Sequence, residues 1–287
     1  MFWSMTACLL GLVAQSGTSE TVTSGGKTRE YILYDPVGAS AKPKQLILAF
    51  HGFGQKAEDL EHDIMLNDLA KKEGFVVAYP RGIGLGWNAG KCCGQEDDLQ
   101  FVDDLLADLK KRANIDPNHV FVTGMSNGAM MAYRLAAERP SQIAAAAIVA
   151  GSMETPPTQK VAVPILHIHG AADIVVTYDG KPSKLPGGFT PSLSTRKAVG
   201  EWADVNGCNS TPVQTQLAPA PFQVTRDEFA AGSAGAEVIL IVISDGGHLW
   251  PGVANPTVSA VLKPLLGQTN NNVNATEIVV DFFKNHR

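Results

Sequence analysis

Short apolar runs alternate with amphipathic stretches from about residue 28 to the C-terminus. Two of the runs, Gln45–Phe50 and Phe75–Tyr79, are apolar at almost every position, which is typical of strands that are buried on both faces. We expect further buried strands at Val120–Thr123, Ile143–Ala150, Ile165–His169 and Val238–Ile243, and an edge strand at Glu30–Tyr34.

The stretches between the runs carry apolar residues at helical spacing. The clearest is Asp97–Arg112, whose first turn is acidic and whose last turn is basic, as the helix dipole favours. Further helices are expected at Asp59–Lys72, Asn127–Arg139, Thr195–Asn206 and Ala275–Asn285. This alternation predicts an α/β fold with a mostly parallel central sheet and helices on both faces.

We expect a single domain over residues 21–287, preceded by about 20 residues that form a signal peptide or a loose arm. The stretch Tyr178–Pro191 is rich in Gly, Pro and Lys, which predicts a surface loop, and Ser210–Ala236 shows no clear pattern.

The amino-acid composition excludes several classes of protein for this chain. Hydrophobic residues make up 45% of the 287 positions, which is enough for a sizeable core and excludes a disordered or fibrous chain. The net charge is −5, and the longest basic run is Lys110–Arg112, so we expect no nucleic-acid partner.

The N-terminal stretch Met5–Ala14 is apolar but too short to cross a bilayer. It resembles the apolar part of a secretory signal and is followed by the small residues Ser16 and Gly17, although no Lys or Arg precedes it. We therefore expect a secreted or periplasmic protein, or a cytoplasmic one if this leader is not functional. No other segment reaches 18 apolar residues, so no membrane partner is expected.

Four cysteines occur, at positions 8, 92, 93 and 208. Loss of a leader would remove Cys8 and leave three, which allows one disulfide and one free thiol. A bridge from Cys92 or Cys93 to Cys208 would close a loop of more than about 100 residues. Buried reduced thiols are the alternative in a cytosolic protein. No second pair of ligands stands at metal spacing, so we predict no metal site.

A candidate nucleophile lies at Ser126, in the G-x-S-x-G motif Gly124–Gly128. A β-rich run precedes the motif and a helical run follows, which is the strand–turn–helix setting of a nucleophile elbow. Side chains two residues before and after the serine would collide with the neighbouring strand and helix, which explains the two glycines. The alternative is an ordinary turn whose serine caps the helix.

His248 is the candidate base, because it follows the strand Val238–Ile243 in a glycine-rich loop. Asp173 is the candidate acid, because it stands just beyond the strand Ile165–His169; Asp179 and Asp204 are its rivals. The chain order Ser, Asp, His is that of a known catalytic arrangement. We expect His167 and His169 to be packed within their strand.

An oxyanion hole is predicted where the strand ending at Phe50 runs into His51-Gly52-Phe53-Gly54. We assign one donor to the Phe53 N–H, or to Gly54 if the register differs by one, and the other to the Asn127 N–H. His51 is expected to brace this loop rather than to act as a second base.

Taken in order along the chain, these segments resemble the carbohydrate-esterase family 1 feruloyl esterases and the polyhydroxybutyrate-depolymerase-like esterases of the α/β-hydrolase superfamily. The matching segments, which span about residue 30 to the C-terminus, are His51–Gly54, Trp87–Asn88, Cys92–Gly94, Asp97–Asp98 with Phe101–Val102, Gly124–Gly128, His167–Gly170 with Asp173, Trp202 with Asn206–Cys208, and Gly247–Gly252.

The resemblance implies an α/β-hydrolase fold and hydrolysis of carboxylic esters, often feruloyl esters of plant cell-wall polysaccharide, sometimes acetyl esters or hydroxyalkanoate oligomers. It implies Ser126, Asp173 and His248 as the triad, and a disulfide from Cys92 or Cys93 to Cys208. An aromatic acyl group would need an apolar pocket, for which Trp250 and Trp87 are candidate walls unless each only packs its own loop.

We therefore expect a serine carboxylesterase whose partner is an ester substrate and which needs no cofactor, with feruloyl esters as the first expectation. The alternatives are a polyhydroxybutyrate depolymerase, an acetylxylan or general short-chain esterase, a serine peptidase of the same fold, and a non-catalytic binding protein of this fold. The acyl specificity and the oligomeric state are left open.

Overall fold

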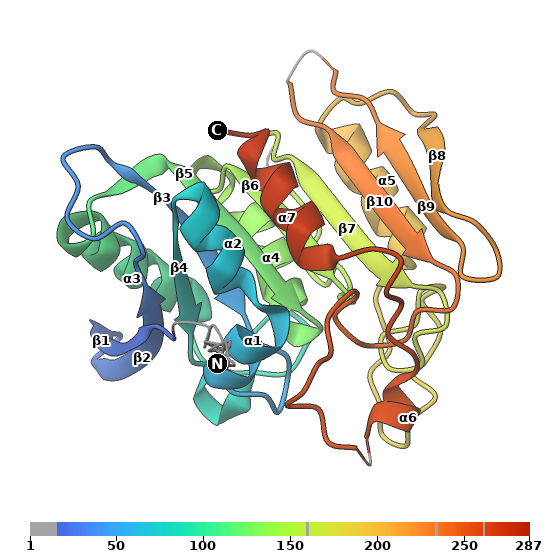
Figure 1. Cartoon of the computed structure of the whole chain (residues 1–287), viewed down its shortest axis with the longest axis horizontal. Coiled ribbons are helices and arrows are strands. Elements are labelled where there is room, and N and C mark those ends of the chain that lie inside the picture. Colours follow the sequence, from blue (N-terminus) through green and yellow to red (C-terminus); the bar gives the residue numbers. More distant parts are fainter. Residues whose placement is uncertain (1–15, 159–160, 233–234, 261) are drawn as a thin grey trace, which may run out of the picture.

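A ten-stranded sheet runs through the centre of the described chain, which in this computed structural model comprises residues 16–158, 161–232, 235–260 and 262–287. The strands lie in the order β1-β2-β4-β3-β5-β6-β7-β10-β9-β8 (Figure 1). Their bounds are β1 Thr18–Ser24, β2 Lys27–Tyr34, β3 Lys44–Phe50, β4 Phe75–Pro80, β5 Ile115–Met125, β6 Ala145–Val149, β7 Ile165–Gly170, β8 Val213–Ala218, β9 Val224–Phe229 and β10 Val238–Ile243.

The centre of the sheet is parallel and its margins are antiparallel. Strands β4, β3, β5, β6, β7 and β10 pair in parallel, so their carboxyl ends meet at one edge. Strands β1 and β2 join one margin and β9 and β8 the other, all in antiparallel pairing. The predicted mostly parallel sheet is confirmed.

Helices cover both faces of the sheet. Helices α1, α2 and α7 lie in front of it in Figure 1, and α3, α4 and α5 lie behind it. The helices among the described residues are α1 Ala57–Ile64, α2 Leu66–Glu73, α3 Asp98–Arg112, α4 Asn127–Glu138, α5 Thr195–Val205, α6 Lys263–Leu266 and α7 Ala275–Lys284, with 3₁₀ turns at Ile83–Leu85 and Pro140–Gln142.

Two apolar cores result, because successive side chains of a strand point to opposite faces. In β3, Ile47 and Ala49 pack with α1, α2 and α7, while Leu46 and Leu48 pack with α3 and α4. All four are fully buried, which is why this strand reads as one continuous apolar run.

The margins of the sheet differ from the prediction. The strand expected at Glu30–Tyr34 is β2, and it is not an edge strand because β1 pairs outside it. Strands β8 and β9 occupy the stretch that showed no clear pattern; the first five residues of β8 are exposed, so no apolar run marks it.

The helix expected at Asp59–Lys72 is two helices, because Met65 adopts a left-handed conformation with φ 52° between them.

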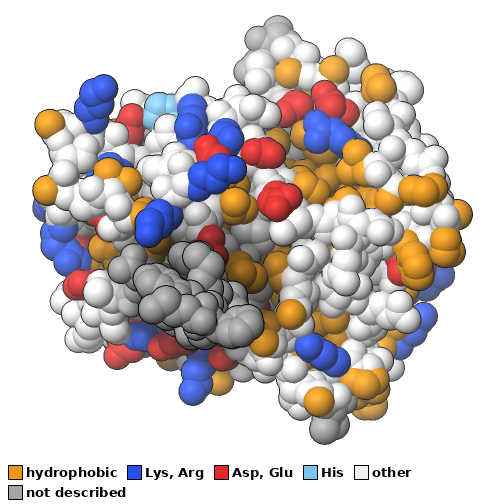
Figure 2. Space-filling model, viewed as in Figure 1, with side chains coloured by type: hydrophobic (Ala, Val, Ile, Leu, Met, Phe, Trp, Pro, Cys, Tyr) orange, Lys and Arg blue, Asp and Glu red, His pale blue; other side chains and the backbone are white. Residues whose placement is uncertain are grey.

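The expected leader or loose arm falls mostly on residues 1–15, which lie outside the described residues. Its last three positions, 18–20, belong to β1, so the folded domain includes residues before position 21. Within the described part of the chain, no helix is long and apolar enough to cross a membrane. On the face shown in Figure 2, Lys and Arg side chains are interspersed with Asp and Glu.

Candidate active site

Ser126 stands in the sharp turn between β5 and α4, with φ 55° and ψ −122°. A non-glycine residue rarely adopts this backbone conformation, and such strain is concentrated at functional sites. The Ser126 side chain makes no capping bond to the helix that follows, so the capping interpretation is wrong. A Cβ on Gly124 would lie 2.6 Å from the Phe50 carbonyl oxygen, and one on Gly128 would overlap the same oxygen.

His248 joins the proposed nucleophile to the proposed acid. Its Nε2 lies 2.9 Å from Ser126 Oγ and its Nδ1 lies 2.7 Å from Asp173 Oδ2. The loop after β10 presents the histidine, and the His248 N–H donates to the Leu266 carbonyl at 2.6 Å. The three side chains chosen from sequence are therefore in contact, although they are separated by up to 122 positions along the chain.

The Asp173 carboxylate is buried and held on both of its oxygens. Oδ1 accepts the N–H groups of Val175 at 2.8 Å and Val176 at 3.0 Å, which leaves Oδ2 for His248. Burial alone would raise the pKa of Asp173, but the charge of His248 and hydrogen bonds from His169 and His248 outweigh it and hold that pKa well below its usual range. The acid is therefore ionised and accepts the His248 Nδ1–H.

Asn127 directly follows Ser126, and Phe53 lines the same cavity as Ser126, so the two predicted oxyanion donors belong to residues at this site. Among the described groups, none accepts the N–H of Phe53 or that of Asn127. The N–H of Gly54 instead donates to the Leu85 carbonyl at 2.7 Å, which leaves Phe53 as the available donor of this loop.

A cavity of about 450 Å³ opens onto Ser126 and His248. Its walls are largely apolar and come mainly from the loop His51–Gln55 and from the segment before α7. The apolar lining residues are Phe53, Met125, Val175, Val258, Leu262 and Leu266. Phe53 is 61% exposed, so its ring is free to contact a bound molecule.

Known esterases are similar to this chain. NocK of Nocardia uniformis subsp. tsuyamanensis, a protein assigned as an esterase, is 32% identical over an alignment that covers 92% of this chain and 82% of NocK. The chain belongs to the esterases of the α/β-hydrolase superfamily. It is a serine carboxylesterase, which excludes a non-catalytic binding protein.

Other relatives are more distant or longer. Feruloyl esterase B of Piromyces equi is 28% identical over 77% of this chain, which spans 42% of that protein. A bifunctional acetylxylan esterase/xylanase of Neocallimastix patriciarum is 34% identical over 53% of this chain, which spans 22% of it. A family model described as serine aminopeptidase, S33, matches residues 41–159.

The fold has solved counterparts. The acetyl xylan esterase from Aspergillus awamori superposes with a TM-score of 0.60 and 18% identity, over 81% of this chain and 94% of that one. This likeness confirms the α/β-hydrolase fold of the esterase.

The two tryptophans expected to line the acyl pocket do not reach it. Trp87 is 0% exposed and its Nε1–H donates to the His51 carbonyl at 2.9 Å. Trp250 is 1% exposed and its Nε1–H donates to Thr276 Oγ1 at 2.9 Å. The substrate-binding prediction for both is wrong, because each indole packs inward from its loop. Phe53, predicted only for its backbone, supplies the exposed aromatic ring.

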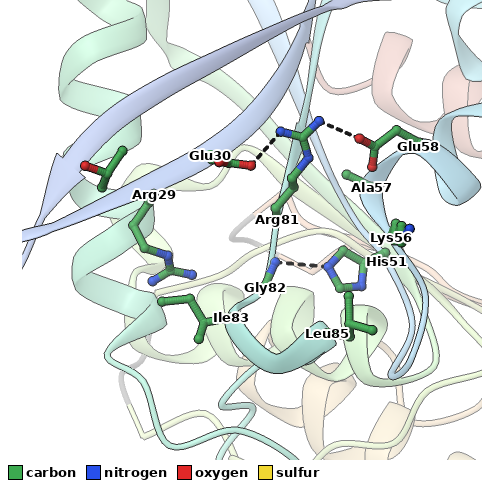
Figure 3. A pocket seen from close by; sticks show the side chains of 11 residues that line it. Arg29, Glu30, His51, Lys56, Ala57, Glu58, Arg81, Gly82, Ile83 and Leu85 are labelled. Carbon is green, nitrogen blue, oxygen red and sulfur yellow. Dashed lines mark hydrogen bonds and ion pairs between the residues drawn. The ribbon is translucent and has the colours of Figure 1, made fainter.

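His51 braces the loop that carries Phe53, as expected. Its Nδ1 lies 2.8 Å from the Gly52 carbonyl and its Nε2 accepts the Gly82 N–H at 3.0 Å (Figure 3). Burial lowers the pKa of His51, so the ring is neutral with both nitrogens engaged. Neither nitrogen is available as a second base.

A second cavity, of about 540 Å³, lies behind this loop. Arg81 crosses it and pairs with Glu30 at 2.9 Å and with Glu58 at 2.5 Å (Figure 3). Glu30 lies on β2 and Glu58 lies on α1, so the two ion pairs of Arg81 connect this margin of the sheet to α1 across the cavity.

The predicted disulfide to Cys208 is not formed. Cys92 and Cys93 are bonded to each other, and Cys208 is a free thiol that lies 3.2 Å from the Ala236 carbonyl oxygen. Cys92 contacts Asn127 beside the nucleophile, whereas Cys208 follows α5 and lies next to β10. The described residues contain no group of three or more His, Cys, Asp or Glu side chains arranged to hold a metal ion.

Proposed function

We propose that this esterase releases hydroxycinnamic acids from feruloyl esters of plant cell-wall polysaccharide, through a triad of Ser126, His248 and Asp173. The observation that carries the proposal is that His248 bridges the other two side chains, at 2.9 Å and 2.7 Å. This is the arrangement in which an imidazole takes a serine proton while a carboxylate holds it in the required tautomer.

Acylation follows from the positions of these groups. His248 Nε2 takes the proton as Ser126 Oγ attacks the ester carbonyl. The charge on the carbonyl oxygen is stabilised by the N–H groups of Phe53 and Asn127. His248 then passes the proton to the leaving alcohol, and the acyl group stays on Ser126.

Deacylation repeats the sequence with water. His248 takes a proton from the water, which attacks the acyl-enzyme at the same oxyanion hole, and returns it to Ser126 as the acid leaves. Asp173 remains ionised throughout and stabilises the imidazolium.

The volume and lining of the cavity beside Ser126 support an aromatic acyl group. A volume of about 450 Å³ with Phe53, Leu262 and Leu266 in its walls suits a planar ring, which gains from apolar contact and from stacking. Feruloyl esterase B, one of the relatives, bears the name of this activity. An acetyl group would leave most of such a cavity unused.

An acetylxylan or short-chain esterase is the second candidate, because another relative and a structural neighbour are named as acetyl xylan esterases. A polyhydroxybutyrate depolymerase and a peptidase are outcomes that the same experiment would reveal.

A substrate panel tests the proposal. Purified protein is assayed with methyl ferulate, p-nitrophenyl acetate, p-nitrophenyl butyrate, amorphous polyhydroxybutyrate and an aminoacyl p-nitroanilide, each beside the Ser126→Ala variant. We expect the highest kcat/KM for methyl ferulate and no turnover by the variant. A higher kcat/KM for acetate would instead assign a short-chain esterase.

We also infer export, from the apolar stretch Met5–Ala14. The N-terminal sequence of the protein recovered from the medium or periplasm tests this. A protein that stays in the cytoplasm with its first residue intact would contradict it.

A further inference from the structure

A buried chain of polar side chains runs from α4 to the loop that holds Asp173. Tyr133 Oη lies 2.7 Å from His167 Nδ1, His167 Nε2 lies 3.0 Å from His169 Nδ1, and His169 Nε2 lies 2.8 Å from the Val176 carbonyl oxygen. The three side chains are at most 1% exposed. Nothing in the acyl-transfer steps above uses them.

The last acceptor of the chain, a carbonyl oxygen, determines where His169 carries a proton. A carbonyl oxygen can only accept, so His169 carries a proton on Nε2. A singly protonated His169 then accepts at Nδ1, which lies 3.0 Å from His167 Nε2 and 3.3 Å from Thr195 Oγ1. His167 therefore carries its proton on Nε2, and its Nδ1 accepts from the Tyr133 hydroxyl. Burial, together with the neighbouring His169, lowers the pKa of His167 well below its ordinary value, so the His167 ring is neutral.

The chain ends at the acid. The Val176 carbonyl that accepts from His169 belongs to the same short loop whose N–H groups hold Asp173 Oδ1. His169 Nε2 also lies 3.5 Å from Asp173 Oδ2, the oxygen that accepts from His248. His169 thus faces the carboxylate directly and also fixes the loop that carries it.

The chain begins on the helix of the nucleophile. Tyr133 lies on α4, the helix that starts immediately after Ser126. We propose that Tyr133, His167 and His169 are positioning residues that tie the helix of Ser126 to the loop of Asp173 through the core. This link is independent of His248, so the acid keeps its place while the base moves between the serine and the leaving alcohol.

The proposal rests on the proposed triad and is tested through Asp173. His169→Leu removes the donor to Val176 and should lower kcat about tenfold to a hundredfold with KM nearly unchanged. His169→Gln keeps an N–H donor and should recover most of that loss. Tyr133→Phe should lower kcat about threefold, the effect of one buried hydrogen bond.

Tyr79→Phe is the matched control. Its hydroxyl is equally buried and donates to Asn67 Oδ1 at 2.7 Å, in the core on the opposite face of the sheet. It should lose similar thermal stability and keep its kcat. Equal kcat values for Tyr79→Phe and Tyr133→Phe would overturn the proposal.

A double-mutant cycle separates positioning from general damage. In an Asp173→Asn background, His169→Leu should cost less than about twofold in kcat, because the group it positions is already impaired. If His169→Leu lowers kcat by the same factor in both backgrounds, the positioning role is wrong while the triad stands. If Ser126→Ala retains ester hydrolysis, the proposed function itself fails.

Discussion

The Asn127 side chain forms two hydrogen bonds with the backbone of Trp87: its Oδ1 accepts the Trp87 N–H at 2.7 Å, and its Nδ2 donates to the Trp87 carbonyl at 3.0 Å. Trp87 in turn donates from Nε1 to the His51 carbonyl. Asn127, the residue after Ser126, is therefore linked through Trp87 to His51, the first residue of the predicted oxyanion loop. This link fixes the spacing between the two proposed oxyanion donors, Asn127 N–H and Phe53 N–H.

Replacing Asn127 by Ala should impair catalysis although its backbone donor remains. Loss of both side-chain bonds frees the Trp87 loop, and we expect kcat to fall about tenfold to a hundredfold with KM little changed. Steady-state kinetics on methyl ferulate measures this. Asn206→Ala is the control, because Asn206 grips Val163 in the same way, with bonds of 3.2 Å and 2.7 Å, away from the site. It should lose stability and keep kcat; equal losses of kcat in both variants would contradict the prediction.

Asp173→Asn should lower kcat by about four orders of magnitude, because an amide cannot fix the His248 tautomer that accepts the serine proton. Binding should persist, so KM should change little. Asp179→Asn, which removes an exposed carboxylate paired with Lys181, should leave kcat unchanged. An Asp173→Asn protein with more than a tenth of the normal kcat would assign the acid role to another residue.

Phe53→Ala should change specificity. Its side chain is the exposed aromatic ring in the wall of the cavity beside Ser126, whereas its proposed oxyanion donor is a backbone group and stays in place. We expect kcat/KM for methyl ferulate to fall about tenfold, the effect of losing one aromatic contact, and that for p-nitrophenyl acetate to fall much less. Ile83→Ala is the control, because Ile83 is 43% exposed and lines the second cavity instead. It should leave the ratio of kcat/KM for methyl ferulate to kcat/KM for p-nitrophenyl acetate unchanged. An unaltered ratio in Phe53→Ala would place the acyl group elsewhere.

Acid should destabilise the wild-type protein through His167. Its pKa is lowered in the folded state, so below about pH 6.5 the unfolded chain binds a proton that the folded chain does not. The free energy of unfolding should therefore fall by up to about 1.4 kcal/mol per pH unit from this residue alone. His167→Gln should reduce that slope between pH 6.5 and 5.

The measurement is urea unfolding of both proteins from pH 8 to pH 5. At pH 8 neither state carries the proton, so that value gives the effect of the substitution without titration. His51, whose pKa is also lowered, is present in both proteins and supplies part of the remaining slope. If the free energy of unfolding of the two proteins changed with pH to the same extent, His167 would not be the source of the acid destabilisation.

Gly128→Ala should prevent correct folding or lower stability severely, because the new Cβ would overlap the Phe50 carbonyl oxygen and press on that of His51. Both oxygens are backbone atoms, of the last residue of β3 and of the residue after it, so they cannot move aside without a large cost in free energy. Gly200→Ala is the control, since Gly200 is in the interior of α5 and a Cβ added there would meet no atom within 4 Å. It should raise stability by about 0.5–1 kcal/mol. Thermal unfolding of the two variants measures the difference.

The parallel centre of the sheet and the meeting of Ser126, Asp173 and His248 were predictable from sequence, for a common physical reason. A strand buried on both faces must be apolar throughout, and catalytic groups collect where such strands end. Ser126, Asp173 and His248 each follow an apolar run, so their positions along the chain already placed them at one edge.

The features that could not be predicted from the sequence depend on the direction in which a side chain points in the folded protein. Trp250 lies two positions from His248, but nearness along a loop does not say which way a side chain points, and its indole enters the core. Strand β8 has no apolar run because its side chains are exposed. Cys208 was assigned to a bridge that needs a partner nearby in space, and Cys92 and Cys93 pair with each other instead.

The alternation along β7 couples folding to catalysis. Leu166 and Ile168 enter one core, while His167 and His169 project to the opposite face, toward Tyr133 and the acid loop. Inserting a single residue into this strand would exchange the two sets, sending imidazoles into the aliphatic layer under α7 and leaving the polar chain without its middle. Strand β7 thus contributes to the apolar core with one face and supports the site with the other. A shift of one residue along this strand would disrupt both the core packing and the site.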